Sequence, residues 1–173
     1  MTMITIQVTD KAVLDMLGEL SRRMTNLQPA MKEIGEDIVD STKRRFADGV
    51  DPDGNEWKAN STETTIPFYL GAFGGSHKKD GSLSKAGAAR SAAKKPLTGE
   101  TKSLRTYINY QLDGNSGVRI GSPMVYAAMQ QFGGTTSPNS MIPGKTIPAR
   151  PFLGLSDADT SNILDIVRSY LVG

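Results

Sequence analysis

The chain has 173 residues, of which 38% are hydrophobic, and its net charge is +2. This length suits one compact domain, but the hydrophobic fraction is low for it, so we expect a single domain over residues 1–173 with part of its length outside the core. The absence of cysteine and the presence of one histidine, His77, exclude disulfides and Cys-type zinc sites and leave histidine-based triads without most of their parts.

The sequence also lacks the features of an exported or membrane protein. A membrane-spanning helix needs roughly eighteen or more consecutive apolar residues, and no such run occurs. The first eight residues have neither a basic segment nor a long apolar segment of the kind found in signal peptides. We therefore expect a soluble protein that is intracellular when made and makes no membrane contact.

The N-terminal region predicts a strand followed by a helix. Residues 4–8 alternate β-branched and polar side chains, which is the pattern of a half-buried strand. A stripe of apolar residues spaced by three and four then predicts a helix over residues 11–25, with Thr9 or Asp10 as its N-cap.

A second apolar stripe follows Pro29 and predicts another helix. It runs over residues 31–46 and ends at Gly49, a natural C-cap. Proline fits the first turn of a helix, and the pattern is compatible with either a helical hairpin or one kinked rod. Of these arrangements we favour two helical segments in near continuity.

Residues 51–96 show little periodicity, and their glycines lie among serine, alanine and lysine residues. Such a segment buries too little apolar surface to offset the entropy of ordering it. We therefore predict a long mobile loop that is ordered on assembly, with a short helix over residues 86–93.

The same part of the chain is strongly basic. Between Gly74 and Arg105, eight basic residues and two acidic ones give a net charge of +6. This segment could meet DNA phosphates or an acidic protein surface, although a solvated loop needs no partner at all. A non-specific DNA-binding module is therefore the alternative function.

The C-terminal half predicts a β-hairpin and two helices. Residues 106–112 and 118–121 flank a turn rich in glycine and asparagine, which is typical of a hairpin. A short helix over residues 124–132 and a loop over residues 133–147 are expected next. Ser156 and an acidic residue three positions later resemble a capping box, so we predict a terminal amphipathic helix after it.

The segment that follows the second helix superficially suggests calcium. Asp51, Asp53 and Asn55 match the first three ligand positions of an EF-hand, but the glycine falls at the fourth position and the twelfth is Thr62. We expect instead a Pro-Asp-Gly turn that folds Trp57 back onto the second helix. Acidic residues on that helix flank its apolar stripe and precede basic ones, which indicates a solvated face. No enzyme activity, cofactor or metal is expected.

For Arg150 and three aromatic residues, the sequence leaves open whether the role is structural or a contact with another subunit. Prolines on both sides of Arg150 restrict its backbone, and its guanidinium could form an ion pair, clamp carbonyl groups or contact another subunit. Tyr126, Phe132 and Phe152 could belong to the core or to an interface, because aromatic residues are common in both.

Several of these pieces occur together in one order. They cover residues 46–57, 96–99, 120–122, 126–128, 131–134 and 147–154. In this order the pieces resemble the phage virion morphogenesis family, the tail completion proteins of Mu-like and related contractile-tailed bacteriophages. The basic stretch around residues 74–95 departs from the family pattern.

This resemblance implies a small α+β protein, which we expect to be an antiparallel sheet packed by the long N-terminal helices and a C-terminal helix, with long mobile loops. It implies a role in completing the head-proximal end of a phage tail and in head–tail joining, with other tail or head-connector proteins as partners. The six-fold organisation of such tails implies a ring, with a hexamer expected. The protein would lie in the tail or neck of the virion, and in the host cytoplasm during assembly. The candidate interface residues are Trp57, Lys78, Lys79, Lys94, Lys95, Tyr126, Phe132, Arg150 and Phe152.

Overall fold

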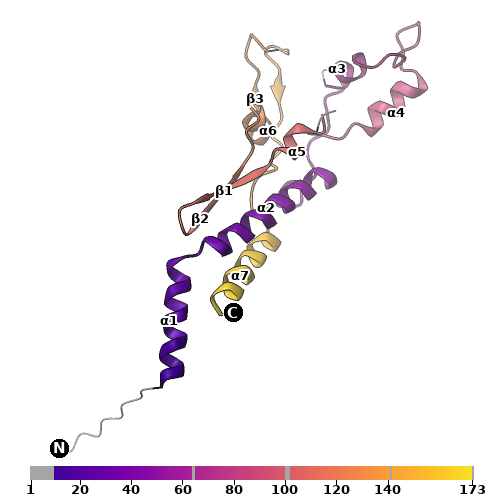
Figure 1. Ribbon diagram of the computed structural model, residues 1–173. Coiled ribbons are helices and arrows are strands. Elements are labelled where there is room, and N and C mark those ends of the chain that lie inside the picture. The colour runs from indigo at the N-terminus through magenta and orange to yellow at the C-terminus, as the bar shows by residue number, and fades with distance from the viewer. Residues whose placement is uncertain (1–9, 64, 100–101, 141, 173) are drawn as a thin grey trace, which may run out of the picture.

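A computed structural model describes residues 10–63, 65–99, 102–140 and 142–172. Within these residues the protein is α+β, with seven helices and two small antiparallel sheets of two strands each. The strand predicted over residues 4–8 lies outside the described residues. Figure 1 shows an elongated molecule in which a long helix, α2, connects a projecting helix, α1, to the rest of the chain.

The elements that follow one another along the chain are α1 (Lys11–Thr25), α2 (Gln28–Asp48), α3 (Thr65–Gly71), α4 (Lys85–Ala93), α5 (Ser103–Thr106), β1 (Asn109–Asp113), β2 (Gly117–Gly121), α6 (Ala127–Phe132), β3 (Gly134–Thr135), β4 (Thr146–Ile147) and α7 (Asp157–Val172).

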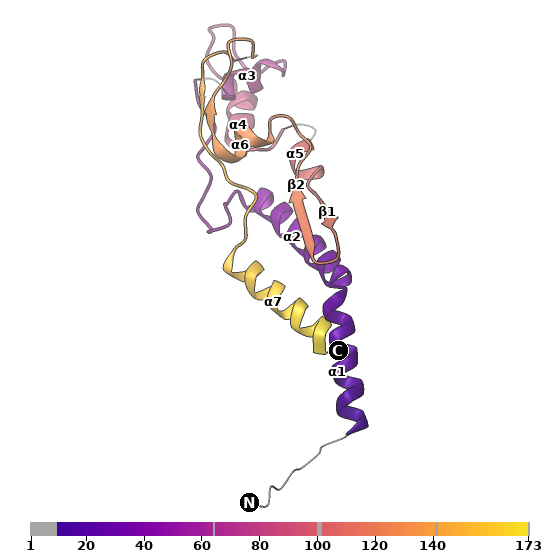
Figure 2. The same cartoon turned by 90° about the vertical axis from the view of Figure 1, so that its left-hand side faces the viewer.

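The first two helices follow each other in near continuity, as predicted. The Asp10 carboxylate caps α1 by accepting a hydrogen bond from the N–H of Ala12 at 2.8 Å. Asn26 ends α1 in an extended conformation, and α2 begins two residues later with a proline in its first turn. The chain therefore bends between the helices without folding back into a hairpin (Figures 1 and 2).

The predicted β-hairpin packs against α2. Its register pairs Asn109 with Gly121, and Gly114 in the turn has a φ of +64°, which glycine adopts without strain. Gly35 lies in the interior of α2, and a Cβ atom there would be 2.6 Å from the ring of Tyr110. Glycine at this position therefore allows the hairpin to approach the helix backbone closely.

The core forms around the C-terminal part of α2, with the hairpin on one side of this helix and α7 on the other (Figures 1 and 2). The ring of Phe46, near the end of α2, lies 5.3 Å from the rings of both Trp57 and Phe152. The buried members of this cluster are Val39, Phe46, Trp57, Leu104, Ile108, Ala127 and Phe152. They come from segments spread over most of the sequence, so the core closes only when these segments meet.

The segment predicted as a long loop contains more regular structure than expected. Helices α3 and α4 form a two-helix unit over residues 65–93, called the insert below, and only α4 was predicted. Arg90 donates hydrogen bonds to the carbonyl of Gly74 and the hydroxyl of Ser76, at 3.2 and 3.1 Å. A Cβ atom on Gly87 would lie 2.0 Å from the Ser76 carbonyl oxygen, so the insert is packed tightly at this point. Polar contacts with the backbone thus hold together a segment whose low apolar content predicted a mobile loop with one short helix.

Three other boundaries differ from the sequence prediction. Thr106 lies in the short helix α5, so β1 begins only at Asn109, and α6 begins at Ala127. The segment predicted as a loop over residues 133–147 contains the short pair β3 and β4. Such short elements carry too few residues for a periodic signal in the sequence.

Candidate assembly surface

Residues 148–154, called the proline strap below, cross the core without regular secondary structure. The side chain of Gln131, near the end of α6, forms hydrogen bonds with the strap backbone of the kind that a neighbouring strand would form. Its Oε1 accepts hydrogen bonds from the N–H groups of Phe152 and Leu153, both at 3.0 Å, and its Nε2 donates to the Leu153 carbonyl at 2.9 Å. These bonds satisfy backbone polar groups of Phe152 and Leu153 inside the protein, as burial requires.

Aromatic side chains pack the strap against the end of α2. Phe152 has no exposed surface, and Trp57 is buried beside it. The indole Nε1 of Trp57 donates a hydrogen bond to the Pro151 carbonyl at 2.8 Å. The backbone N–H of Trp57 donates to the Gly49 carbonyl at 2.8 Å, which confirms that the Pro-Asp-Gly turn folds this residue back onto the second helix.

Arg150 clamps carbonyl groups. Its Nε donates to the carbonyl of Lys58 at 2.7 Å, and a terminal nitrogen donates to that of Ala59 at 2.9 Å. The side chain is buried, and this desolvation lowers the pKa of the guanidinium from its ordinary value. Of the alternatives that the sequence left open, the carbonyl clamp is the one observed within the chain.

A buried ion pair joins α2 to α7. Arg45 on α2 donates to the carboxylate of Asp159 and to the carbonyls of Phe152 and Gly154, the latter two at 3.2 and 2.9 Å. Asp159 also accepts from the N–H and hydroxyl of Ser156, both at 2.8 Å, which confirms the predicted capping box. Sequence reasoning found the cap but not Arg45, because the two charged residues lie 114 positions apart.

The environment of the Asp159 carboxyl group lowers its pKa. Its burial opposes ionisation, but hydrogen bonds from the Ser41 side chain and from Ser156, together with the charge of Arg45, outweigh this effect. The pKa of Asp159 therefore lies below its usual value of 3.8.

A groove of about 410 Å³ opens beside the strap, and it brings together four of the candidate interface residues: Lys94, Lys95, Tyr126 and Arg150. Gln130 also lines it, and its Oε1 is buried without a hydrogen-bond partner among the described residues. Apolar groups such as Ile147 line the groove as well, which suits a partner that presents an apolar side chain.

The aromatic residues around α6 offer apolar surface to solvent. Tyr126 is 43% exposed and Phe132 is 77% exposed, at opposite ends of this helix. Val125, which the sequence reasoning did not single out, is 99% exposed. Large apolar side chains grouped at one place on a surface are typical of contact sites.

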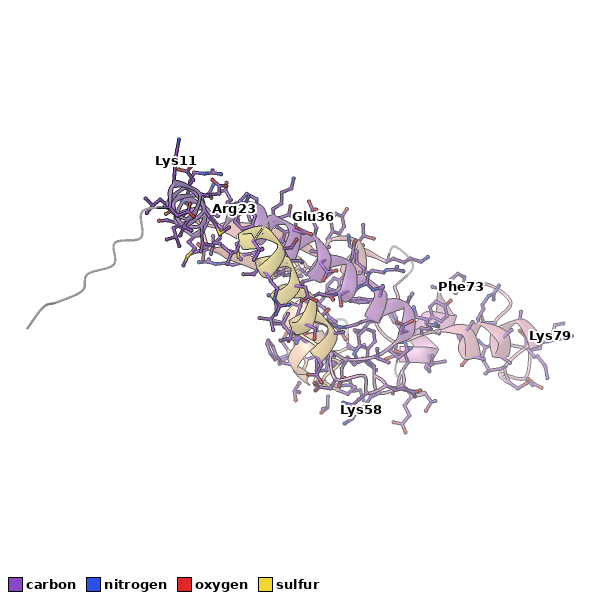
Figure 3. The ribbon with its side chains drawn as sticks, turned by 90° about the horizontal axis from the view of Figure 1, so that it is seen from below. Lys11, Arg23, Glu36, Lys58, Phe73 and Lys79 are labelled. Carbon is purple, nitrogen blue, oxygen red and sulfur yellow. The ribbon has the colours of Figure 1, made fainter. Side chains whose placement is uncertain are left out.

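The candidate lysines fall into two groups. Lys94 donates to the Thr98 carbonyl and Lys95 to the Ala47 carbonyl, so both are tied to the body of the protein. Lys78 and Lys79 are exposed at the far end of the insert. Figure 3 shows Lys79 at the end of the molecule opposite α1.

Neither a metal site nor a membrane-spanning helix is found among the described residues. The Asp51 carboxylate is used within its own turn, where it accepts from the N–H groups of Asp53 and Asn55 at 3.0 and 2.8 Å. No cluster of three or more acidic or histidine side chains there could hold a metal ion. Over the same described residues, none of the helices is both long enough and apolar enough to cross a bilayer.

A profile of the phage virion morphogenesis family matches residues 8–172, which is nearly the whole chain. The protein belongs to this family. Its members take part in building the virion, which implies a structural role and not an enzymatic one.

Two relatives are similar over parts of the chain. G protein 2 of the Mu-like prophage FluMu of Haemophilus influenzae is 34% identical over 71 residues, or 41% of this chain and 49% of that protein. The provisionally named capsid assembly protein G of Escherichia phage Mu is 43% identical over 49 residues, or 28% of this chain and 30% of that protein. The matched part spans less than half of either relative. No solved structure matches the chain.

The family motifs seen in the sequence meet at the proline strap. Phe46, Trp57, Gln131 and Phe152 belong to three separate motifs, and they contact one another or the strap directly. In the single chain, Trp57, Arg150 and Phe152 thus hold the fold and present almost no surface, whereas Tyr126 and Phe132 do present surface. That any of the nine candidate residues contacts a partner stays a prediction.

Proposed function

We propose that this protein completes the head-proximal end of a phage tail and supports the joining of tail and head. The observation that carries this proposal is the family match over residues 8–172. The motifs that resemble tail completion proteins supply the more specific role. On this proposal the protein works by fitting against other virion proteins, in the host cytoplasm during assembly and later in the neck of the virion.

The proposed assembly is a ring, with a hexamer expected from the six-fold organisation of tails. In a ring, each subunit offers one surface to a different surface on its neighbour. The groove and the aromatic residues Tyr126 and Phe132 are the proposed contact with a neighbouring subunit, because both aromatic side chains are exposed and Tyr126 lines the groove. The chain acts as a single domain, and the insert is the part proposed to contact a head-connector protein.

The function is tested in a phage that carries a stop codon in the gene for this protein. We expect filled heads and complete-length tails to accumulate unjoined in the lysate, as seen by electron microscopy, and the plasmid-encoded protein to restore joined particles. Empty or aberrant heads would instead indicate a capsid assembly role, as the name of the phage Mu relative suggests for that protein. Joined, infectious particles without the protein would overturn the proposal.

The proposed contact is tested by Phe132→Ser, with Leu164→Ser on α7 as a matched control that is also exposed. Neither change removes a buried side chain, so both variants should fold normally. We expect Phe132→Ser to reduce the yield of joined particles and Leu164→Ser to leave it unchanged. An equal yield from both variants would exclude α6 from the contact.

A second candidate function is contact with DNA. It is favoured by the exposure of Lys78 and Lys79 at the end of the insert, where phosphates could be reached without competition from nearby structure. Lys78→Glu with Lys79→Glu should then weaken DNA binding and flatten its dependence on salt, whereas Lys32→Glu on α2 should have little effect. Negligible binding by the unmodified protein at low salt would exclude this candidate.

A further inference from the structure

Helix α1 carries an apolar face that is largely exposed, since in the described part of the chain only α7 packs against this helix. It has no buried residue. Five large apolar side chains on this helix are between 51% and 72% exposed: Val13, Leu14, Met16, Leu17 and Met24. So many exposed apolar groups on one short helix mark a contact surface.

Hydrogen bonds with Tyr170 of α7 hold the C-terminal end of α1 to the body. Arg23 donates to the Tyr170 carbonyl at 2.8 Å, and the Tyr170 hydroxyl donates to the Asn26 carbonyl at 2.6 Å. The N-terminal turns of α1 stand away from the body (Figures 1 and 2). A helix of 15 residues is marginally stable without tertiary contacts, so this part of α1 would be stabilised by a partner.

The spacing of the apolar residues indicates what kind of partner fits. Val13, Leu17, Leu20 and Met24 follow one another at intervals of four, three and four, which is the a and d pattern of a coiled coil. A seam of this kind is complementary to another helix with the same seam. The chain itself provides such a helix in a second copy.

We propose that α1 pairs with α1 of a second copy of this chain, in antiparallel orientation. In this register Val13 of one helix lies opposite Met24 of the other, and Leu17 lies opposite Leu20. The overlap includes nearly all of Lys11–Thr25 and encloses four apolar layers. The two bodies then lie at opposite ends of the helix pair.

The charges of α1 favour this orientation. Asp10, Lys11 and Asp15 give its N-terminal half one net negative charge. Glu19, Arg22 and Arg23 give its C-terminal half one net positive charge. Antiparallel pairing places each acidic half beside a basic half and opposes the two helix dipoles, whereas parallel pairing would bring like charges together.

Positions beside the seam raise no obstacle to the pairing. Leu14, Met16 and Ser21 are uncharged, and Arg23 is already bound to Glu19 at 2.8 Å. This two-fold contact is separate from the proposed ring contact, which uses α6 and the groove. It therefore holds or fails independently of the proposed role in tail completion.

The pairing is tested by cross-linking, because the chain has no cysteine of its own. Val13→Cys and Met24→Cys variants are purified separately and then mixed under mild oxidation. The antiparallel register places these two positions in one layer, so a disulfide-linked dimer should form in the mixture. Each variant alone should form little, because identical positions would be roughly 16 Å apart along the helix pair.

A dimer formed by Val13→Cys alone would show a parallel pair and overturn the proposed register. Failure of the mixture to cross-link, together with a monomeric mass at every concentration, would overturn the proposal itself.

A second measurement uses sedimentation of the full chain. Leu17→Glu places a charge in the seam and should weaken dimerisation by roughly tenfold or more. Asp15→Asn, on the polar face of the same helix, should leave it unchanged apart from a small effect of charge. Circular dichroism should show that both variants remain folded, since neither residue is buried. Equal dimerisation of the two variants would contradict the proposal.

Discussion

Helices α1 and α2 are neighbours in the chain and have similar amphipathic patterns, yet their surroundings differ completely. α2 buries nine residues between the hairpin and α7, whereas α1 buries none. An apolar stripe therefore predicts a helix, but does not show whether the rest of the chain covers its apolar face. In this protein one helix holds the fold together, and the other has its face free for a partner.

The largest loss of stability is expected where α2 is joined to α7. Asp159→Ala leaves the guanidinium of Arg45 buried without its carboxylate, and we expect the free energy of unfolding to fall by about 3–5 kcal/mol. Urea unfolding followed by circular dichroism measures it. The control is Asp165→Ala, which removes an exposed ion pair with Arg168 and should cost about 0–1 kcal/mol. Equal losses would mean that the buried pair does not hold α2 against α7.

A smaller loss is expected where α2 meets the hairpin. Gly35→Ala places a methyl group within 2.6 Å of the Tyr110 ring, and overpacking of this kind costs about 1–3 kcal/mol. Alanine is also the better helix former by about 1 kcal/mol, which reduces the net loss. Gly18→Ala on α1, where no atom lies within 4 Å of the added methyl group, should instead be stabilising or neutral. Thermal unfolding of the two variants would show opposite shifts.

Acidic pH should weaken the Arg45–Asp159 ion pair between α2 and α7, with a smaller loss of stability than Asp159→Ala causes. The pKa of Asp159 is lower in the folded protein than its usual value of 3.8, so its contribution is complete above that value and is lost as the pH falls below it through the folded pKa. Urea midpoints between pH 5 and pH 2 should fall, and Asp159→Asn should show a shallower fall. Glu19 on exposed α1 also has a low pKa, about 2, because of hydrogen bonds from Arg22 and Arg23. If the urea midpoint of Asp159→Asn falls as steeply with pH as that of the unmodified protein, other carboxyl groups cause the acid dependence.

The smallest effect is expected on α1. Leu17→Ala removes a large side chain that is already exposed, so the stability of the monomer should change by less than about 0.5 kcal/mol. Ile38→Ala, the matched change in the buried face of α2, should cost about 2–5 kcal/mol. Both are measured by urea unfolding at a protein concentration at which the chain is monomeric. A large loss in Leu17→Ala would mean that α1 is covered by its own chain.

The sequence was sufficient wherever local chemistry decides the structure. Apolar stripes and caps predicted α1, α2 and α7, and the turn around Gly114 predicted the hairpin. It was insufficient for the insert, whose order depends on contacts such as that between Gly87 and the Ser76 carbonyl. Contacts of this kind leave no periodic signal, because they join a few polar or small residues across a turn.

The candidate assembly surface could likewise be predicted only in part from the sequence. The motifs around Trp57, Gln131 and Phe152 were recognised as a group, and the structure brings them together at the strap. Their burial could not be predicted, because aromatic residues are common both in cores and at interfaces. The partnership of Arg45 with Asp159 was missed for a different reason, since only the tertiary fold brings these residues together.

Arg45 has a mechanical consequence. One guanidinium grips α2, the proline strap at Phe152 and Gly154, and α7 through Asp159. A displacement of α7 at Asp159 is therefore transmitted through this guanidinium both to the strap and to α2. Force applied at α7 should therefore be shared among α7, the strap and α2, so that the three segments separate together.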